Sequence, residues 1–145
     1  MKIERDTMPN PYEIIQIPRT NRALVRLFEN FEEATATTDG ASTTKYTGNV
    51  YEISAMAGSA LEATVAENYA EWLTIARERE YAALADEIRI KRDMLLAASD
   101  PRALEDYPQT AETRAVWLAY RHALRDVPEQ AGFPYEVIWP EAPDE

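Results

Sequence analysis

The chain has 145 residues, a formal net charge of −11 and no cysteine, which fits one domain or two small ones. The acidity argues against nucleic acid and anionic membranes as direct ligands, because phosphate neutralisation requires clustered lysine and arginine. The absence of cysteine excludes disulfides and thiolate sites. No run approaches the ~20 apolar residues of a membrane span, and the charged first residues form no signal peptide. We therefore expect a cytosolic setting.

Glycine and proline divide the chain into three segments. Residues 1–57 are predicted to form a small antiparallel β module, residues 58–99 a long helix, and residues 100–145 a C-terminal helix with an extended tail. Both breakers are absent between Ser59 and Ser99, as a helix requires, because proline removes a backbone donor and glycine costs conformational entropy. The predicted fold class is therefore α+β.

The first segment contains short β-prone runs. Residues 12–17 are bracketed by prolines, residues 23–28 are apolar, and residues 43–46 and 50–53 also have strand composition. Between them, Asp39-Gly40 signals a turn with positive φ. These runs predict a sheet of roughly three strands, which needs a helix or a partner over its apolar face.

The second segment is predicted to be a helix from Ser59 to Ser99. Ser59 and Glu62 have the spacing of a capping box, and apolar residues follow at helical intervals. A helix of this length would be a rod of ~60 Å, which favours a coiled coil and a homo-oligomer through residues 59–99. The apolar stripe thins at residues 77–80, so a break near Glu80 is the alternative.

The third segment begins at Asp100-Pro101, where proline disfavours helix in the preceding residue. Thr110 is the expected N-cap of a second helix, with Glu112 in its positive first turn. One face of this helix is predicted to carry Thr113, Val116, Trp117, Tyr120 and Leu124.

The two helices are predicted to form an αα-hairpin. Trp117 and Tyr120 would pack against Met94 and Leu95 at the end of the long helix. Arg121 and Arg125 lie near the C-terminal end of the second helix, where the helix dipole favours cations. Pro128 is expected to end that helix.

No residue pattern points to catalysis, a cofactor or a metal ion. His122 is the only histidine, and the chain has no nucleophile motif or glycine-rich phosphate loop. Asp39-Gly40 lacks the regularly spaced oxygen ligands of a calcium loop. We therefore expect a protein that is not an enzyme.

A modest group of basic residues remains: Arg89, Lys91, Arg92, Arg114, Arg121 and Arg125. These side chains would either dock an acidic partner or pair within the chain with neighbours such as Glu87, Asp93 and Asp126.

The stretch from Leu124 to Pro140 contains three prolines, one glycine and three aromatic residues. We call its residues 128–140 the aromatic strap. The strap either closes the hairpin core, which needs the area that aromatic side chains bury, or it presents interface anchors to a partner. Both uses are combined if Phe133 and Val137 point inward while Tyr135 and Trp139 face a partner.

An ordered set of short motifs occupies the last third of the chain. It contains KRDMLL from Lys91, Ser99-Asp100, W-x-x-Y-R-x-x-L-R-D from Trp117, Gly132-Phe133-Pro134 and Trp139-Pro140. This set resembles the phage tail assembly chaperone family over about residues 85–140. The family commonly has tryptophan after Ser-Asp, where this chain has Pro101. The residues near Asn10 more loosely resemble the N-terminal part of small phage tail proteins.

The resemblance implies a role in phage or prophage tail assembly, with a tail-fibre or receptor-binding protein as partner. It implies a location in the host bacterial cytoplasm during assembly, and brings no catalytic residues. The alternative is a structural adaptor that remains in the virion tail as an oligomer. The residues expected to contact the partner are Trp117, Tyr120, Arg121, Arg125, Phe133, Tyr135 and Trp139.

Overall fold

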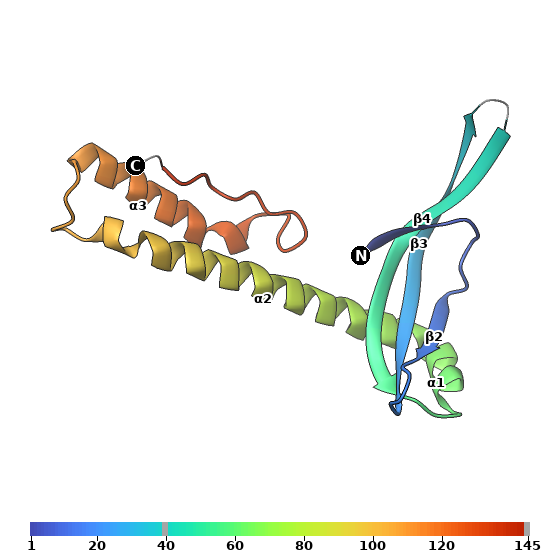
Figure 1. The fold of residues 1–145 in the computed structure, drawn as a ribbon. Helices are drawn as coiled ribbons and strands as arrows, with labels where there is room; N and C mark the ends of the chain where they lie inside the picture. Colours follow the sequence, from blue (N-terminus) through green and yellow to red (C-terminus); the bar gives the residue numbers. More distant parts are fainter. Residues whose placement is uncertain (39–40, 144–145) are drawn as a thin grey trace. The chain divides into compact units, whose positions relative to one another are not determined.

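The computed structural model describes residues 1–38 and 41–143 and has the predicted α+β architecture (Figure 1). It contains a four-stranded antiparallel sheet, α-helices α1, α2 and α3, and a short 3-10 helix, η1. The chain divides into two compact units, Met1–Glu80 and Tyr81–Glu145. The division into three segments stays a prediction.

The sheet of the first unit has the strand order β1-β4-β3-β2. Its strands are β1 (Lys2–Arg5), β2 (Tyr12–Gln16), β3 (Arg22–Thr38) and β4 (Ala41–Met56). The prediction of roughly three strands missed β1, and the two runs at residues 43–46 and 50–53 belong to one strand. The predicted turn at Asp39-Gly40 lies outside the described residues.

A β-bulge interrupts the long pairing of β3 with β4 between Glu29 and Glu32. Asn30 has a φ of 53°, a left-handed conformation that asparagine tolerates better than most residues. Across the bulge, a Cβ on Gly48 would collide with the Phe31 ring. Glycine is therefore required at this position of β4.

The core of the first unit lies between the sheet and its helical residues. Val25, Leu27 and Ile53 from the sheet pack with Val65 of α1 (Leu61–Glu67) and Leu73 of α2 (Tyr69–Ala103). Burial of such side chains contributes roughly 1.5–3 kcal/mol each relative to full exposure. The helices thus supply the cover that the sequence required for the sheet.

The predicted helix from Ser59 to Ser99 is in fact two helices, separated at Asn68. The Asn68 side-chain amide donates to the Thr64 carbonyl oxygen over 3.1 Å, so the side chain competes with helical backbone pairing. Residues 77–80 lie within α2, and the alternative of a break near Glu80 is wrong. The predicted capping box is also wrong, because Ala60 is the N-cap and makes no side-chain bond.

Helix α2 continues through Pro101 to Ala103, so the predicted end at Asp100-Pro101 is wrong. Proline costs most in the interior of a helix, where it removes a bond and clashes with the preceding turn. Here it occupies the final turn, and Leu104 N–H donates to the Pro101 oxygen over 3.2 Å. An ion pair between Asp100 and Arg121 holds the same turn, with a nitrogen–oxygen distance of 2.7 Å.

The second unit contains α2 from Tyr81 onward, α3 (Ala111–Arg125), η1 (Val127–Glu129) and the aromatic strap. Within it, α3 runs antiparallel to α2 and the strap returns along α2 (Figure 1). The αα-hairpin is therefore present. None of the helices in the described residues combines the length and hydrophobicity that crossing a membrane requires.

Thr110 caps α3 as predicted: its hydroxyl accepts from Thr113 N–H over 3.2 Å. The Glu112 carboxylate accepts hydrogen bonds from its own backbone N–H and from the Thr110 hydroxyl, which lowers the pKa of Glu112 below its usual value. A depressed carboxyl pKa stabilises the fold above the unfolded pKa, and this contribution is lost as pH falls through the folded value.

Replacing Thr110 with alanine is expected to destabilise the second unit by about 1 kcal/mol, because the first turn of α3 loses its cap. The replacement also removes one donor to Glu112, so the loss of stability below pH ~4.5 should become smaller. Urea unfolding at pH 7 and pH 3.5 measures both effects. A T110S control keeps the hydroxyl and should behave as wild type; equal losses in T110S and T110A would contradict the capping role.

Candidate partner-binding surface

The interior of the second unit is built mainly from α3 and η1. Tyr120, Leu124 and Val127 are buried, and Leu124 and Val127 have no exposed surface. The Trp117 and Tyr120 rings meet edge to face with centroids 5.7 Å apart, and the Arg102 guanidinium lies 5.1 Å from the Trp117 ring centroid. Trp117 and Tyr120 therefore hold the hairpin together.

The buried face of α3 differs from the predicted one at two positions. Val116 was expected on that face but is 54% exposed, whereas Arg121 is buried. Met94, expected to receive Trp117 and Tyr120, is 67% exposed. Arg121 can be buried although it is charged, because it finds hydrogen-bond and ion-pair partners inside the unit.

Arg121 has three partners within the hairpin. Its guanidinium donates to the Leu96 carbonyl oxygen over 2.7 Å and to the Ser99 hydroxyl over 2.8 Å. A third contact is the ion pair with Asp100. A buried charge that is paired and hydrogen-bonded in this way ties α3 to the end of α2. Contact of Arg121 with a partner stays a prediction.

Replacing Arg121 with methionine should destabilise the second unit by roughly 1–3 kcal/mol, because buried hydrogen-bonding groups lose their partner. Asp100 stays largely exposed, so no buried charge is left behind. Replacement by lysine keeps the charge but cannot reproduce the planar fork, and should cost less than methionine. Thermal unfolding measures the order; unchanged stability in both variants would contradict the tie.

The aromatic strap contacts α2 through all three of its aromatic residues, and the Tyr135 ring meets Tyr81 with centroids 6.3 Å apart. The Phe133 ring meets Tyr81 edge to face at a centroid distance of 6.4 Å, and the Arg89 guanidinium lies 5.6 Å from its centroid. The Lys91 ammonium lies 4.2 Å from the Trp139 ring centroid. Val137 is partly buried. Phe133, Tyr135 and Trp139 therefore all face the helix with part of their surface, and Tyr135 keeps the larger part of its side chain exposed.

One side chain fixes the ends of the strap. The Gln130 amide donates to the Ile138 carbonyl oxygen over 2.7 Å and accepts from the Ile138 N–H over 2.8 Å. Between them, Glu136 N–H donates to the Gly132 oxygen over 2.7 Å. These bonds shape residues 130–138 into a closed loop rather than a freely extended chain.

A G132A replacement is expected to distort this loop, because a Cβ at position 132 would overlap the Glu136 backbone oxygen. The loop must open to relieve the overlap, and we expect a loss of roughly 1–3 kcal/mol. Amide exchange at Glu136 and Ile138 measures the opening. A matched G58A replacement meets no atom within contact distance and should leave these amides protected; unchanged exchange in G132A would contradict the account.

The same loop presents apolar side chains to solvent. Tyr135 is 58% and Ile138 is 81% exposed, while Leu118 on α3 is 45% exposed. Leu118 also lines an open groove on α3 with Ala119, His122, Ala123 and Asp126. Ile138 was not among the residues predicted to contact the partner. Period-two alternation could have predicted its exposure, because it places Ile138 on the face opposite to Val137 and Trp139.

The basic residues are divided between internal and free roles. Arg89 pairs with Asp86, Arg92 pairs with Asp93, and Arg114 donates to the Ala103 oxygen. Arg125 is exposed and forms no ion pair within the described residues. Arg125 is thus available to match a charge on a partner, whereas Lys91 lies over the Trp139 ring.

The His122 ring is hydrogen-bonded to its helical neighbour Asp126, over 2.9 Å on the surface of α3. Across residues 1–38 and 41–143, no group of histidine and carboxylate side chains could hold a metal ion. The hairpin and strap therefore offer apolar, aromatic and cationic contacts, which are the means of protein recognition.

A comparison with protein families found a match over residues 85–144, to the family described as phage tail assembly chaperone protein. The resemblance identified in the sequence is confirmed over this range, which contains α3, η1 and the strap. Searches of curated proteins and of solved structures found no match to the chain.

Proposed function

We propose that the chain is a non-enzymatic chaperone of phage or prophage tail assembly, whose second unit binds a tail-fibre or receptor-binding subunit. The observation that carries this proposal is the family match over residues 85–144, which coincides with the hairpin and strap. The exposed apolar side chains of the strap support this proposal, since clusters of exposed apolar side chains mark interaction sites. The work would take place in the cytoplasm of the host bacterium.

Such a chaperone would protect a subunit before its assembly is complete. Apolar surfaces and unpaired strand edges of a fibre subunit aggregate until neighbouring subunits cover them. A protein that binds the folded or partly folded subunit shifts the balance by mass action. The chaperone then leaves when the neighbouring subunits take over the same surface.

The structure supports different roles for the seven residues expected to contact the partner. Tyr135 offers the largest exposed surface among the aromatic ones, and Phe133 and Trp139 would contribute their uncovered edges. Arg125 would supply charge matching. Trp117, Tyr120 and Arg121 would act mainly by holding the hairpin in the shape that presents these groups.

Co-expression with the fibre or receptor-binding protein of the same phage tests the proposal. The full chain should raise the soluble yield of the fibre protein and co-elute with it on a sizing column, and removal of residues 128–145 should abolish both. A thermal melt of the shortened chain shows whether the hairpin persists. A fibre protein that is equally soluble alone, with no complex, would contradict the proposal.

A structural adaptor is the second candidate function. The length of α2, 35 residues, favours it, because a long helix suits an oligomer through residues 59–99 that would remain in the mature tail. Mass spectrometry of purified particles separates the two. A chaperone should be absent or far below the copy number of the fibre, whereas an adaptor should be present in fixed stoichiometry.

A further inference from the structure

The long hairpin of the first unit has an open edge. Strand β2 pairs with β3 only as far as Leu27, and β3 continues to Thr38 with β4 as its partner. Among the described residues, no strand pairs with the other side of β3 beyond Leu27. Unpaired backbone groups along an edge are a template for another strand.

The direction of these backbone groups follows from the register. Val50 N–H donates to the Met1 oxygen, so Val50 faces β1, and alternation along β4 turns Thr47 toward β3. Thr47 is opposite Glu32. Glu32 therefore faces β4, while the N–H and C=O groups of Glu33 and Thr35 point outward. These groups form the open edge of β3.

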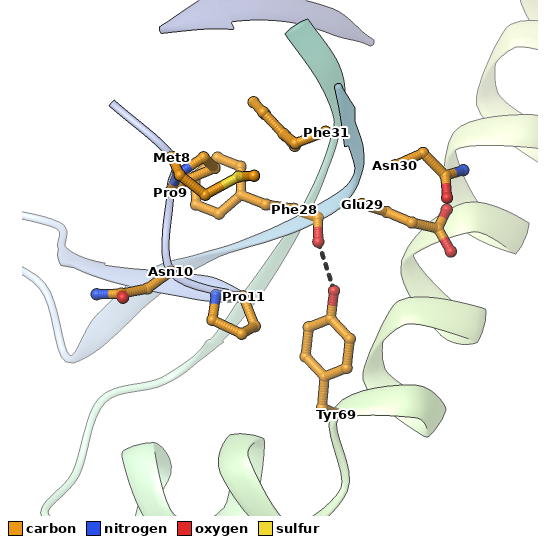
Figure 2. Close-up of a pocket in the computed structure, with 9 residues that line it drawn as sticks. All are labelled: Met8, Pro9, Asn10, Pro11, Phe28, Glu29, Asn30, Phe31 and Tyr69. Carbon is orange, nitrogen blue, oxygen red and sulfur yellow. Dashed lines mark hydrogen bonds between the residues drawn. The ribbon is translucent and has the colours of Figure 1, made fainter. Parts of the chain in front are cut away.

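A pocket lies where the open edge begins. It has a volume of about 360 Å³ and is lined by Met8, Pro9, Asn10, Pro11, Phe28, Glu29, Asn30, Phe31 and Tyr69 (Figure 2). Phe28 N–H donates to the Pro11 oxygen over 2.8 Å, and the Phe28 oxygen accepts from the Tyr69 hydroxyl over 2.6 Å. With the polar groups of Phe28 satisfied, the walls are mainly apolar. The volume suits one large apolar side chain.

The Arg5 guanidinium, 4.6 Å from the Phe28 ring centroid, is paired with Glu13, and two carboxylates follow the pocket along β3. Glu32 and Glu33 are exposed and form no ion pair within the described residues. Glu29, in contrast, is paired with Arg77. Burial, with the Glu29 charge as a smaller cause, raises the pKa of Tyr69, so its hydroxyl remains a donor to Phe28. The site therefore favours a ligand with lysine or arginine near Glu32 and Glu33.

We propose that the open edge of β3 and this pocket bind an extended segment of a partner protein as an added strand. Main-chain bonds to Glu33 and Thr35 would hold the segment, and an apolar side chain in the pocket would set its register. Lysine or arginine on the segment would match Glu32 and Glu33. A second copy of this chain fits less well, because pairing two open edges would bring the same carboxylates together.

Selection from a random decapeptide display library on the immobilised full-length chain tests this proposal. Selected peptides, made synthetically with a fluorophore, are then measured by fluorescence anisotropy. They should share one large apolar residue close to lysine or arginine. The double variant E32K/E33K should weaken their binding at least tenfold and reverse its salt dependence.

Two threonines supply a matched pair of backbone variants. Thr35 and Thr44 are opposite each other, and their hydroxyls share one hydrogen bond of 3.3 Å. Both residues face outward, but on opposite edges of the hairpin, so T35P and T44P each remove one outward donor and the same side-chain bond. Proline is tolerated where the N–H faces solvent. T35P should weaken peptide binding at least tenfold, and T44P less than threefold.

Three results would overturn the proposal. The first is a selection that yields no binding peptide, and the second is a set of peptides that bind T35P and T44P equally. The third is a wild-type dimer, detected by light scattering, that the T35P replacement dissociates; this result would assign the edge to a second copy of the chain. Circular dichroism checks that each variant is folded. If T35P does not fold, the loss of peptide binding in E32K/E33K still tests the proposal. The site does not depend on the proposed function, and replacements in the strap should leave peptide binding unchanged.

Discussion

Replacement of both Tyr135 and Ile138 with serine is expected to weaken the complex with the tail subunit at least tenfold while the chain stays folded. These are the most exposed large apolar side chains of the strap. An anchor residue buried in an interface contributes about 2 kcal/mol or more, and 1.4 kcal/mol corresponds to a factor of ten in affinity. Co-elution and calorimetric titration with the subunit measure the loss.

The control for this variant uses exposed apolar residues outside the family match. Ile17 and Met56 belong to the first unit and are 36% and 62% exposed. An I17S/M56S double variant removes exposed apolar surface from the first unit and should bind the tail subunit as wild type does. If both double variants weaken the complex equally, or neither does, the strap is not the binding surface.

Replacement of Leu124 with alanine is expected to destabilise the second unit by about 2–5 kcal/mol, the range found for buried leucine positions. Leu124 has no exposed surface and lies on α3 with buried Tyr120 and close to buried Val127. A cavity at this position removes contacts from both neighbours, and such a loss is a large part of the stability of a small domain. Urea unfolding followed by fluorescence gives the difference.

The matched control is Leu118→Ala, on the same helix and with the same chemical change. Leu118 is 45% exposed, so its truncation forms no closed cavity and should cost less than about 1 kcal/mol. Loss of tail-subunit binding in L118A without loss of stability would extend the binding surface to α3. Equal destabilisation by L124A and L118A would contradict the assignment of the core.

Local sequence signals predicted the elements whose stability is largely local. The cap at Thr110 and the helix after it are confirmed, because the capping side chain and the helix lie next to each other in the sequence. Strand β1 was missed, since its Lys2–Arg5 sequence carries no strong β-signal. Its pairing with β4 depends on residues more than 40 positions away, which a local pattern does not contain.

The predicted helix boundaries were wrong where tertiary contacts outweigh local preference. Ser59 and Glu62 have the spacing of a capping box, yet Ala60 is the N-cap of α1. At Asp100-Pro101, proline predicts an end, but the bond of Arg121 to the turn keeps residues 99–103 helical. Both errors arise because propensity is a weak prior that packing can override.

The family motif located the candidate surface, but the exposure of its residues required the structure. Arg121 belongs to the W-x-x-Y-R-x-x-L-R-D motif and was expected to match a charge on a partner. Its three partners come from α2, about 20 residues earlier, so its burial could not be predicted from α3 alone. Ile138 is exposed because the amide of Gln130 engages its backbone and leaves the side chain outside the loop.

Hydrogen exchange of the full chain, alone and in complex with its tail subunit, tests the central claim most directly. Amides of residues 130–139 should become protected in the complex, with a smaller effect along the exposed face of α3 near Leu118. Protection confined to the first unit, or no change anywhere despite a stable complex, would contradict the claim that the strap and hairpin bind the tail subunit.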